Sequence, residues 1–157
     1  MPALTFVISF FAIVGIGAIA APLNPSFTEE ELAFYVDNCK ARALITEKRI
    51  LALCQSISMR SAEALPVIHA TPSDEAVGSF QHLINNSAPL PLAERAGDEE
   101  ALYQFSSGST GRPKRVSRTQ AMCRAEAENF VATTHLSAAD NIFCAISLFH
   151  AHHRISG

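Results

Sequence analysis

The chain has 157 residues, of which 48% are apolar and 17% charged, and its formal net charge is −3 at pH 7. This composition excludes an intrinsically disordered protein, and a chain of this length can bury roughly 70% of its unfolded surface, enough for one ordinary core. The Lys and Arg residues are scattered except between Arg112 and Arg118, so we expect no broad basic surface and no nucleic-acid partner.

The first element is the uncharged apolar stretch Ala3–Leu23, which is compatible with two structures. About 20 apolar residues can cross a bilayer, so a small protein anchored in a membrane through residues 3–23 is one alternative. However, no Lys or Arg precedes residue 40 to orient such a span, and two glycines interrupt the stretch. We therefore favour a buried helix over about Thr5–Val14, then a buried strand in Ala18–Pro25 that ends in a Pro/Asn turn.

The same stretch contains "GIGAIA", which matches the glycine pattern of dinucleotide-binding folds. That pattern requires a strand before the glycines and a helix after them. Here the predicted order is the reverse, so we discard a dinucleotide site.

Helix and strand patterns alternate over the next part of the chain. Thr28 with Glu31 three residues later forms a capping-box sequence and predicts a helix that continues to Cys39. Leu32, Tyr35, Val36 and Cys39 would share one face of this helix. A strand in Ala41–Thr46, a helix in Glu47–Met59 and a strand in Leu65–Ala70 follow. The alternation predicts an α/β fold, a mainly parallel sheet with helices on both faces.

The remaining chain divides into a connection and a second structured part. Residues 71–100 are rich in Pro, Ser, Asn, Asp and Glu and predict a long surface connection, with one helical turn near "FQHLI". A strand at Ala101–Phe105, a helix in Thr119–His135 and a last strand at Asn141–Phe149 follow. We thus expect a βα part in residues 1–70, the connection in 71–100, and a loop, helix and strand in 101–157.

Four cysteines, Cys39, Cys54, Cys123 and Cys144, lie far apart without any C-x-x-C pair. This spacing favours reduced, mostly buried thiols in a cytoplasmic protein over a disulfide framework or a zinc site.

Hydroxyls, glycines and a cation are concentrated directly after the strand "ALYQF". Glycine allows backbone N–H groups to converge on an anion, hydroxyls add donors, and a lysine adds a positive charge. The candidate phosphate-binding residues are Ser106, Ser107, Gly108, Ser109, Thr110, Gly111 and Lys114. The alternatives are a solvent-exposed Ser/Gly turn between two strands and a phosphate-binding module without catalysis. A Walker A loop is excluded because Gly108 and Gly111 have the wrong spacing and no Lys follows either glycine directly.

The stretch "YQFSSGSTGRPKRV" resembles the phosphate-loop signature of the adenylate-forming, AMP-binding superfamily, without a break from Tyr103 to Lys114. "AIAAPLNPSFTEEELAFYVDNCKARALIT" and "ISLFHAH" resemble two further segments of the family. The likeness is greatest to the acyl-CoA synthetase branch that includes oxalate–CoA ligases. A segment that matches a helix and strand of an α/β domain is also better explained as core than as a membrane anchor.

The resemblance implies an activity and a set of roles. Members join a carboxylic acid to ATP, release pyrophosphate, and pass the acyl group of the adenylate to coenzyme A, with Mg²⁺ as a further cofactor. Ser106 to Gly111 would hold the β- and γ-phosphates, with Lys114 as countercharge. His150 would lie at the floor of the acyl pocket.

The sequence also departs from the family pattern. Arg115 stands where many members have glycine, and Gln120 stands where a histidine is common. The later motifs that bind Mg²⁺, the ribose and the reacting carboxylate are not in this sequence, so we expect an N-terminal fragment, truncated or frameshifted near His153, that is inactive alone. The three terminal histidines, at positions 150, 152 and 153, have no acid or cysteine nearby and are not expected to bind a metal.

Overall fold

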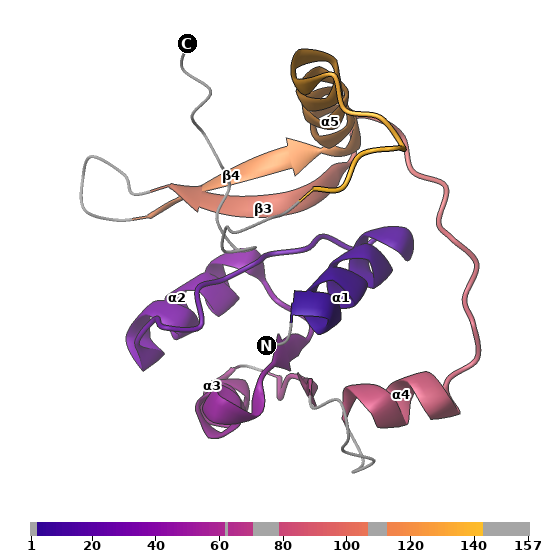
Figure 1. Cartoon of the computed structure of the whole chain (residues 1–157). Helices are drawn as coiled ribbons and strands as arrows, with labels where there is room; N and C mark the ends of the chain where they lie inside the picture. The colour runs from indigo at the N-terminus through magenta and orange to yellow at the C-terminus, as the bar shows by residue number, and fades with distance from the viewer. Residues whose placement is uncertain (1–2, 62, 71–78, 107–112, 143–157) are drawn as a thin grey trace. The chain divides into compact units, whose positions relative to one another are not determined.

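The computed structural model describes residues 3–61, 63–70, 79–106 and 113–142, and Figure 1 shows its helices and strands. The chain divides into two compact units, which we call the first unit (residues 1–12 and 23–91) and the second unit (residues 13–22 and 92–157). Helix α1 (Ala3–Gly15) begins in the first unit and ends in the second. The first unit also contains α2 (Glu29–Cys39), β1 (Leu44–Thr46), the 3-10 turn η1 (Lys48–Ile50), α3 (Leu51–Arg60), β2 (Val67–His69) and α4 (Phe80–Asn86). The second unit contains β3 (Glu100–Ser106), β4 (Lys114–Thr119) and α5 (Gln120–Thr134).

Helix α1 confirms the predicted helix but exposes much of its apolar surface. Leu4 and Phe11 are 70% and 67% exposed, whereas Thr5 and Ser9 are buried. Ser9 Oγ donates to the Thr5 carbonyl oxygen at 2.8 Å, so the buried hydroxyl keeps a hydrogen-bond partner within the helix. With 13 residues α1 is shorter than a bilayer requires, and in the described ranges no helix is both long and apolar enough to span one.

Helix α2 begins as its capping box predicts. Thr28 Oγ1 accepts from the Glu31 amide at 3.3 Å, and Glu31 Oε2 accepts from the Thr28 amide at 2.8 Å. The helix ends where Lys40 takes a left-handed conformation, with φ of 50°. Leu32, Tyr35 and Val36 are buried, which confirms the predicted apolar face, while Cys39 is only partly buried.

The first unit is organised around a parallel strand pair and two helices. Strands β1 and β2 pair in parallel, with Leu44 opposite Val67 and Thr46 opposite His69, and α3 connects them. Leu32 and Val36 on α2 form a buried cluster with Ile57 on α3, which defines the core of this unit. The α/β class predicted from the alternating pattern is confirmed.

The second unit is built on an antiparallel hairpin. Strand β4 pairs with β3 from Glu100 opposite Thr119 to Ser106 opposite Lys114. On the other edge of β3 the Ala20 amide donates to the Ala101 oxygen at 3.0 Å, and Ala20 accepts from the Tyr103 amide at 2.8 Å. The strand predicted for Ala18–Pro25 is thus reduced to a parallel bridge at Ala20, because two prolines in that range lack amide donors.

Two close approaches join the segment after α1 to the one before β3. The Ala93 amide donates to the Gly15 oxygen at 2.8 Å. Gly17 has φ of 78°, and a Cβ atom at this position would lie 3.0 Å from Cδ of Arg95. A residue other than glycine at position 17 would therefore be strained in its backbone and crowded by Arg95.

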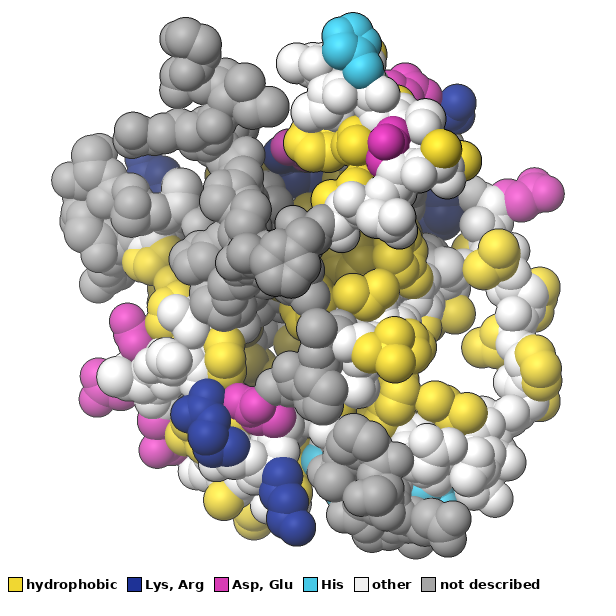
Figure 2. All heavy atoms as spheres, viewed as in Figure 1, with side chains coloured by type: hydrophobic (Ala, Val, Ile, Leu, Met, Phe, Trp, Pro, Cys, Tyr) yellow, Lys and Arg dark blue, Asp and Glu magenta, His cyan; other side chains and the backbone are white. Residues whose placement is uncertain are grey.

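Hydrophobic side chains are widely visible on the face shown in Figure 2. Within α5 none of the described side chains is buried, and Phe130 and Val131 are 46% and 48% exposed. Cys54 is buried and Cys123 partly buried, and both are free thiols. Cys144 lies outside the described residues, and so does the predicted last strand (Asn141–Phe149) from residue 143 onward.

Candidate functional site

The candidate phosphate site lies at the open end of the β3–β4 hairpin. Ser106 is the last residue of β3, Lys114 is the first residue of β4, and the two are opposite each other in the register. Both are exposed. The structure therefore brings together two site residues that are eight positions apart in the sequence. The other candidates, Ser107, Gly108, Ser109, Thr110, Gly111 and His150, lie outside the described residues.

One face of the hairpin carries Ser106 and Lys114. Successive strand residues alternate between faces, so Gln104 and Arg118 share this face. Ser106 Oγ donates to the Lys114 carbonyl oxygen at 3.5 Å, and Arg118 donates to Gln104 Oε1 at 3.4 Å. Arg118 also pairs with Glu126 of α5 at 2.6 Å. These contacts link the strands to the helix on the face that carries Lys114.

The opposite face carries an aromatic and charged cluster formed by Glu100, Tyr103 and Arg115. The guanidinium carbon of Arg115 lies 4.4 Å from the centroid of the Tyr103 ring, which is cation–π geometry. The Tyr103 hydroxyl donates to Glu100 Oε2 at 2.8 Å. The pKa of Glu100 lies below its usual range. The largest cause is a hydrogen bond from Ser117, and the hydrogen bond from Tyr103 and the charge of Arg115 act in the same direction.

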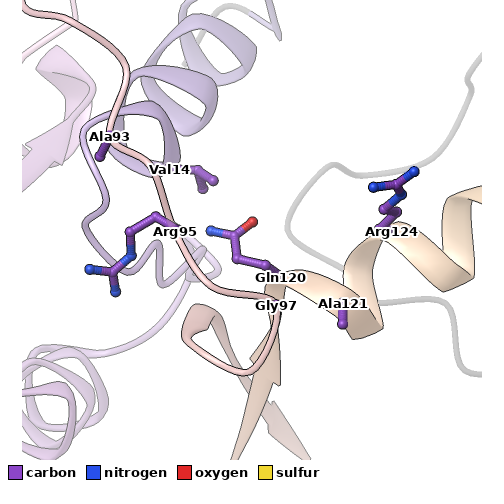
Figure 3. A pocket seen from close by; sticks show the side chains of 7 residues that line it. All are labelled: Val14, Ala93, Arg95, Gly97, Gln120, Ala121 and Arg124. Atoms are coloured by element: carbon purple, nitrogen blue, oxygen red, sulfur yellow. The ribbon is translucent and has the colours of Figure 1, made fainter.

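The second unit also contains an open hollow of about 460 Å³ near the start of α5. Its lining, shown in Figure 3, comprises Val14, Ala93, Arg95, Gly97, Gln120, Ala121 and Arg124. Arg95 and Arg124 lie on opposite sides of Gln120 in that view. Arg95 pairs with Glu99 at 3.1 Å and Arg124 with Glu128 at 2.8 Å, so each guanidinium already has a carboxylate partner. The first amides of α5 are also paired, Gln120 with Glu99 and Ala121 with Gly97. The hollow therefore offers an anion fewer donors than its two arginines suggest.

Strand β4 was expected only in the alternative of a Ser/Gly turn between two strands, and the cluster on its far face was not predicted. The signal was present, because "KRVSRT" follows a Gly/Ser stretch that itself follows a strand, an arrangement typical of a hairpin. The charged residues in it gave a weak strand pattern. The cation–π contact between Arg115 and Tyr103 depends on the register of β3 against β4, which cannot be derived from the sequence alone.

Residues 2–157 match a protein family whose description is "AMP-binding enzyme". The chain belongs to the AMP-binding enzyme family. This establishes the family predicted from the loop signature and from the two further segments.

Similar AMP-binding enzymes include a plant protein and two solved structures. Oxalate–CoA ligase of Arabidopsis thaliana is 32% identical over 163 residues, 97% of this chain and 30% of that protein. The anthranilate CoA ligase AuaEII, solved with anthranoyl-AMP, is 29% identical with a TM-score of 0.65 over 75% of this chain and 23% of that one. ATP-bound MatB of Rhodopseudomonas palustris, 17% identical, shares the fold with a TM-score of 0.69 over 83% of this chain and 25% of that one.

The chain spans 30% of the length of the oxalate–CoA ligase that it matches and 23% of the anthranilate CoA ligase. The family membership thus covers this chain almost completely, while most of each relative has no counterpart in it. Homologues that are CoA ligases support acid activation as the general chemistry of the family to which the chain belongs.

Proposed function

We propose that this chain forms the phosphate-binding part of an ATP-dependent acid–CoA ligase, which joins a carboxylic acid to AMP and then transfers the acyl group to coenzyme A. The observation that carries the proposal is the hairpin that places Ser106 opposite Lys114 at the two ends of the glycine and hydroxyl loop. Family membership and the CoA ligases among the relatives support it.

The first reaction step explains why such a loop is needed. An oxygen of the carboxylate attacks the α-phosphorus of ATP, the bond from that phosphorus to the bridging oxygen breaks, and pyrophosphate leaves with the electron pair. Negative charge therefore grows on the β- and γ-phosphates, where fixed donors stabilise it. We assign this role to residues 106–111 and to the ammonium of Lys114, which adds a charge-assisted hydrogen bond.

The second step transfers the acyl group. The thiol of coenzyme A gives its proton to solvent and its sulfur attacks the acyl carbon. The bond from that carbon to the AMP oxygen breaks, and AMP leaves with the electron pair. For this chain we propose only that His150 borders the acyl pocket.

Mg²⁺ is included in the proposal only because the family resemblance implies it. In the segments that the structure describes, no three His, Cys, Asp or Glu side chains lie together as a metal site. We therefore assign no step to Mg²⁺ and name no residue of this chain as its ligand.

The proposal is tested by titrating the chain with pyrophosphate and with ATP in a calorimeter. Loss of one charge-assisted bond is worth about 1.5 to 3 kcal/mol, so Lys114→Ala should weaken the binding of both ligands about ten- to hundredfold. Lys48→Ala is the matched control, because Lys48 is an exposed lysine on η1 in the first unit. Lys114→Arg keeps the charge and should retain part of the affinity.

Two outcomes contradict the proposal. One is that the unaltered chain binds neither ligand. The other is that Lys114→Ala and Lys48→Ala bind equally well. A loss of affinity for pyrophosphate and ATP that is confined to Lys114→Ala supports a working phosphate loop, whatever the acyl substrate is.

A further inference from the structure

The pair that closes the hairpin is held only weakly by its own side chains. Ser106 and Lys114 are both exposed, and their side-chain contact, from Ser106 Oγ to the Lys114 carbonyl oxygen, is 3.5 Å long. Bonds of that length contribute little, and terminal pairs of an exposed ladder open easily. The backbone ladder pairs these two residues, and a further side-chain contact near the strand ends would keep that terminal pair closed.

The Glu100, Tyr103 and Arg115 cluster is placed to do this. Arg115 is opposite Phe105, and this pair is next to the terminal pair of Ser106 and Lys114. Its guanidinium crosses diagonally to the ring of Tyr103 on the neighbouring strand, 4.4 Å from the centroid. Diagonal cross-strand contacts of this kind stabilise the local register.

The far end of the Tyr103 ring is fixed as well. Its hydroxyl donates to Glu100 Oε2 at 2.8 Å, and the Arg115 charge acts on the same carboxylate. A ring anchored at one end gives the guanidinium a defined surface to pack on. The cluster thus links the first residue of β3 to the second residue of β4.

We infer that Arg115, through its contact with Tyr103, is a positioning residue that keeps Ser106 and Lys114 opposite each other, a role that rests on the function proposed above. Strand alternation places Arg115 and Lys114 on opposite faces, so Arg115 acts through the strand and does not touch the phosphates.

A double-mutant cycle distinguishes positioning from direct contact. The dissociation constant for pyrophosphate is measured for the unaltered chain, Arg115→Ala, Tyr103→Leu and the double variant. An exposed cation–π contact corresponds to a factor of about two to five. Each single variant should raise the dissociation constant by that factor. The double variant should have a dissociation constant no higher than that of the more weakly binding single variant, because both changes remove the same contact.

Conservative and matched variants complete the test. Tyr103→Phe keeps the ring and should bind nearly as the unaltered chain does. Arg124→Ala removes an exposed arginine from α5 in the same unit and should leave the affinity unchanged. Effects of Arg115→Ala and Tyr103→Leu that multiply in the double variant would overturn the inference, because Arg115 would then act independently of the ring.

A second readout needs no ligand. Amide hydrogen exchange at residues 114–116 should accelerate in Arg115→Ala, while exchange at residues 101–103, whose strand is paired on both edges, should not. Unchanged exchange at 114–116 overturns the positioning role even if the loop binds phosphate. Conversely, faster exchange with no effect of Lys114→Ala on binding keeps the strand contact but defeats the proposed function.

Discussion

Arg118 on β4 and Glu126 on α5 form an ion pair with an N–O distance of 2.6 Å, in which the Arg118 side chain is only 13% exposed. The same guanidinium donates to Gln104 on β3 at 3.4 Å. One side chain therefore joins both strands of the hairpin to the helix that follows it. Because the guanidinium is largely shielded from water, this pair should contribute more than an ordinary surface ion pair.

We expect Arg118→Ala to lower the free energy of unfolding by about 1 to 3 kcal/mol, since it removes charge-assisted bonds and the packing of the side-chain stem. The measurement is urea denaturation followed by circular dichroism. Glu126→Gln, which keeps a hydrogen-bond acceptor, should cost less. Arg124→Ala, which removes an exposed pair on the same helix, should cost least; equal effects of the two arginine variants would contradict this ranking.

The capping box of α2 gives a second prediction. Thr28→Ala removes the oxygen that accepts from the Glu31 amide and should lower the free energy of unfolding by about 1 kcal/mol. Thr28→Ser keeps that oxygen and should be close to the unaltered chain. The same denaturation curves check both, and a serine variant as unstable as the alanine one would show that the methyl group, not the cap, matters.

This cap shows what could be predicted from the sequence. A capping box is local, so Thr28 and Glu31 set the start of α2 whatever surrounds it, and the helix begins where the pattern says. Short strands such as β1 and β2 were equally predictable, because apolar runs between two helices leave few other structures. The family followed from an unbroken signature around Gly108.

Features that depend on pairing could not be predicted in the same way. Ala20 lies in an apolar run typical of a strand, yet it makes only a bridge to β3, since prolines limit the donors around it. The exposure of Leu4 with burial of Thr5 on α1 is also set by tertiary packing and contradicts the usual preference of both side chains. The contact between Tyr103 and Arg115 depends on a register that only the structure supplies.

The core of the first unit gives a third prediction. Ile57 is 3% exposed within the cluster of Leu32 and Val36, so Ile57→Ala should leave a cavity and cost about 2 to 5 kcal/mol. Met59, on the same helix, is 82% exposed, and Met59→Ala should change the free energy of unfolding by less than about 0.5 kcal/mol. Similar losses for both variants would mean that this cluster is not the core of the unit.

The fourth prediction concerns the charge state of Glu100. Hydrogen bonds from Ser117 and Tyr103 and the charge of Arg115 favour its ionised form, so its pKa lies below the ordinary value of 4.5. A carboxyl group whose pKa is lower in the folded state stabilises the fold above its unfolded pKa. That contribution should be complete above pH 4.5 and disappear as the pH falls from 4.5 through the lowered pKa.

The titration of Glu100 can be followed directly by the carbon-13 shift of its side-chain carboxyl. Ser117→Ala and Tyr103→Phe each remove one donor, so each should move the pKa back towards 4.5, with the larger movement for Ser117→Ala because its hydrogen bond is the largest cause of the shift. Glu100→Gln assigns the signal and should flatten the acid limb of the stability curve. A carboxyl that titrates at 4.5 in the unaltered chain and in both variants would show that the cluster does not hold its charge, and Tyr103 would then lack the anchor that the positioning role of Arg115 requires.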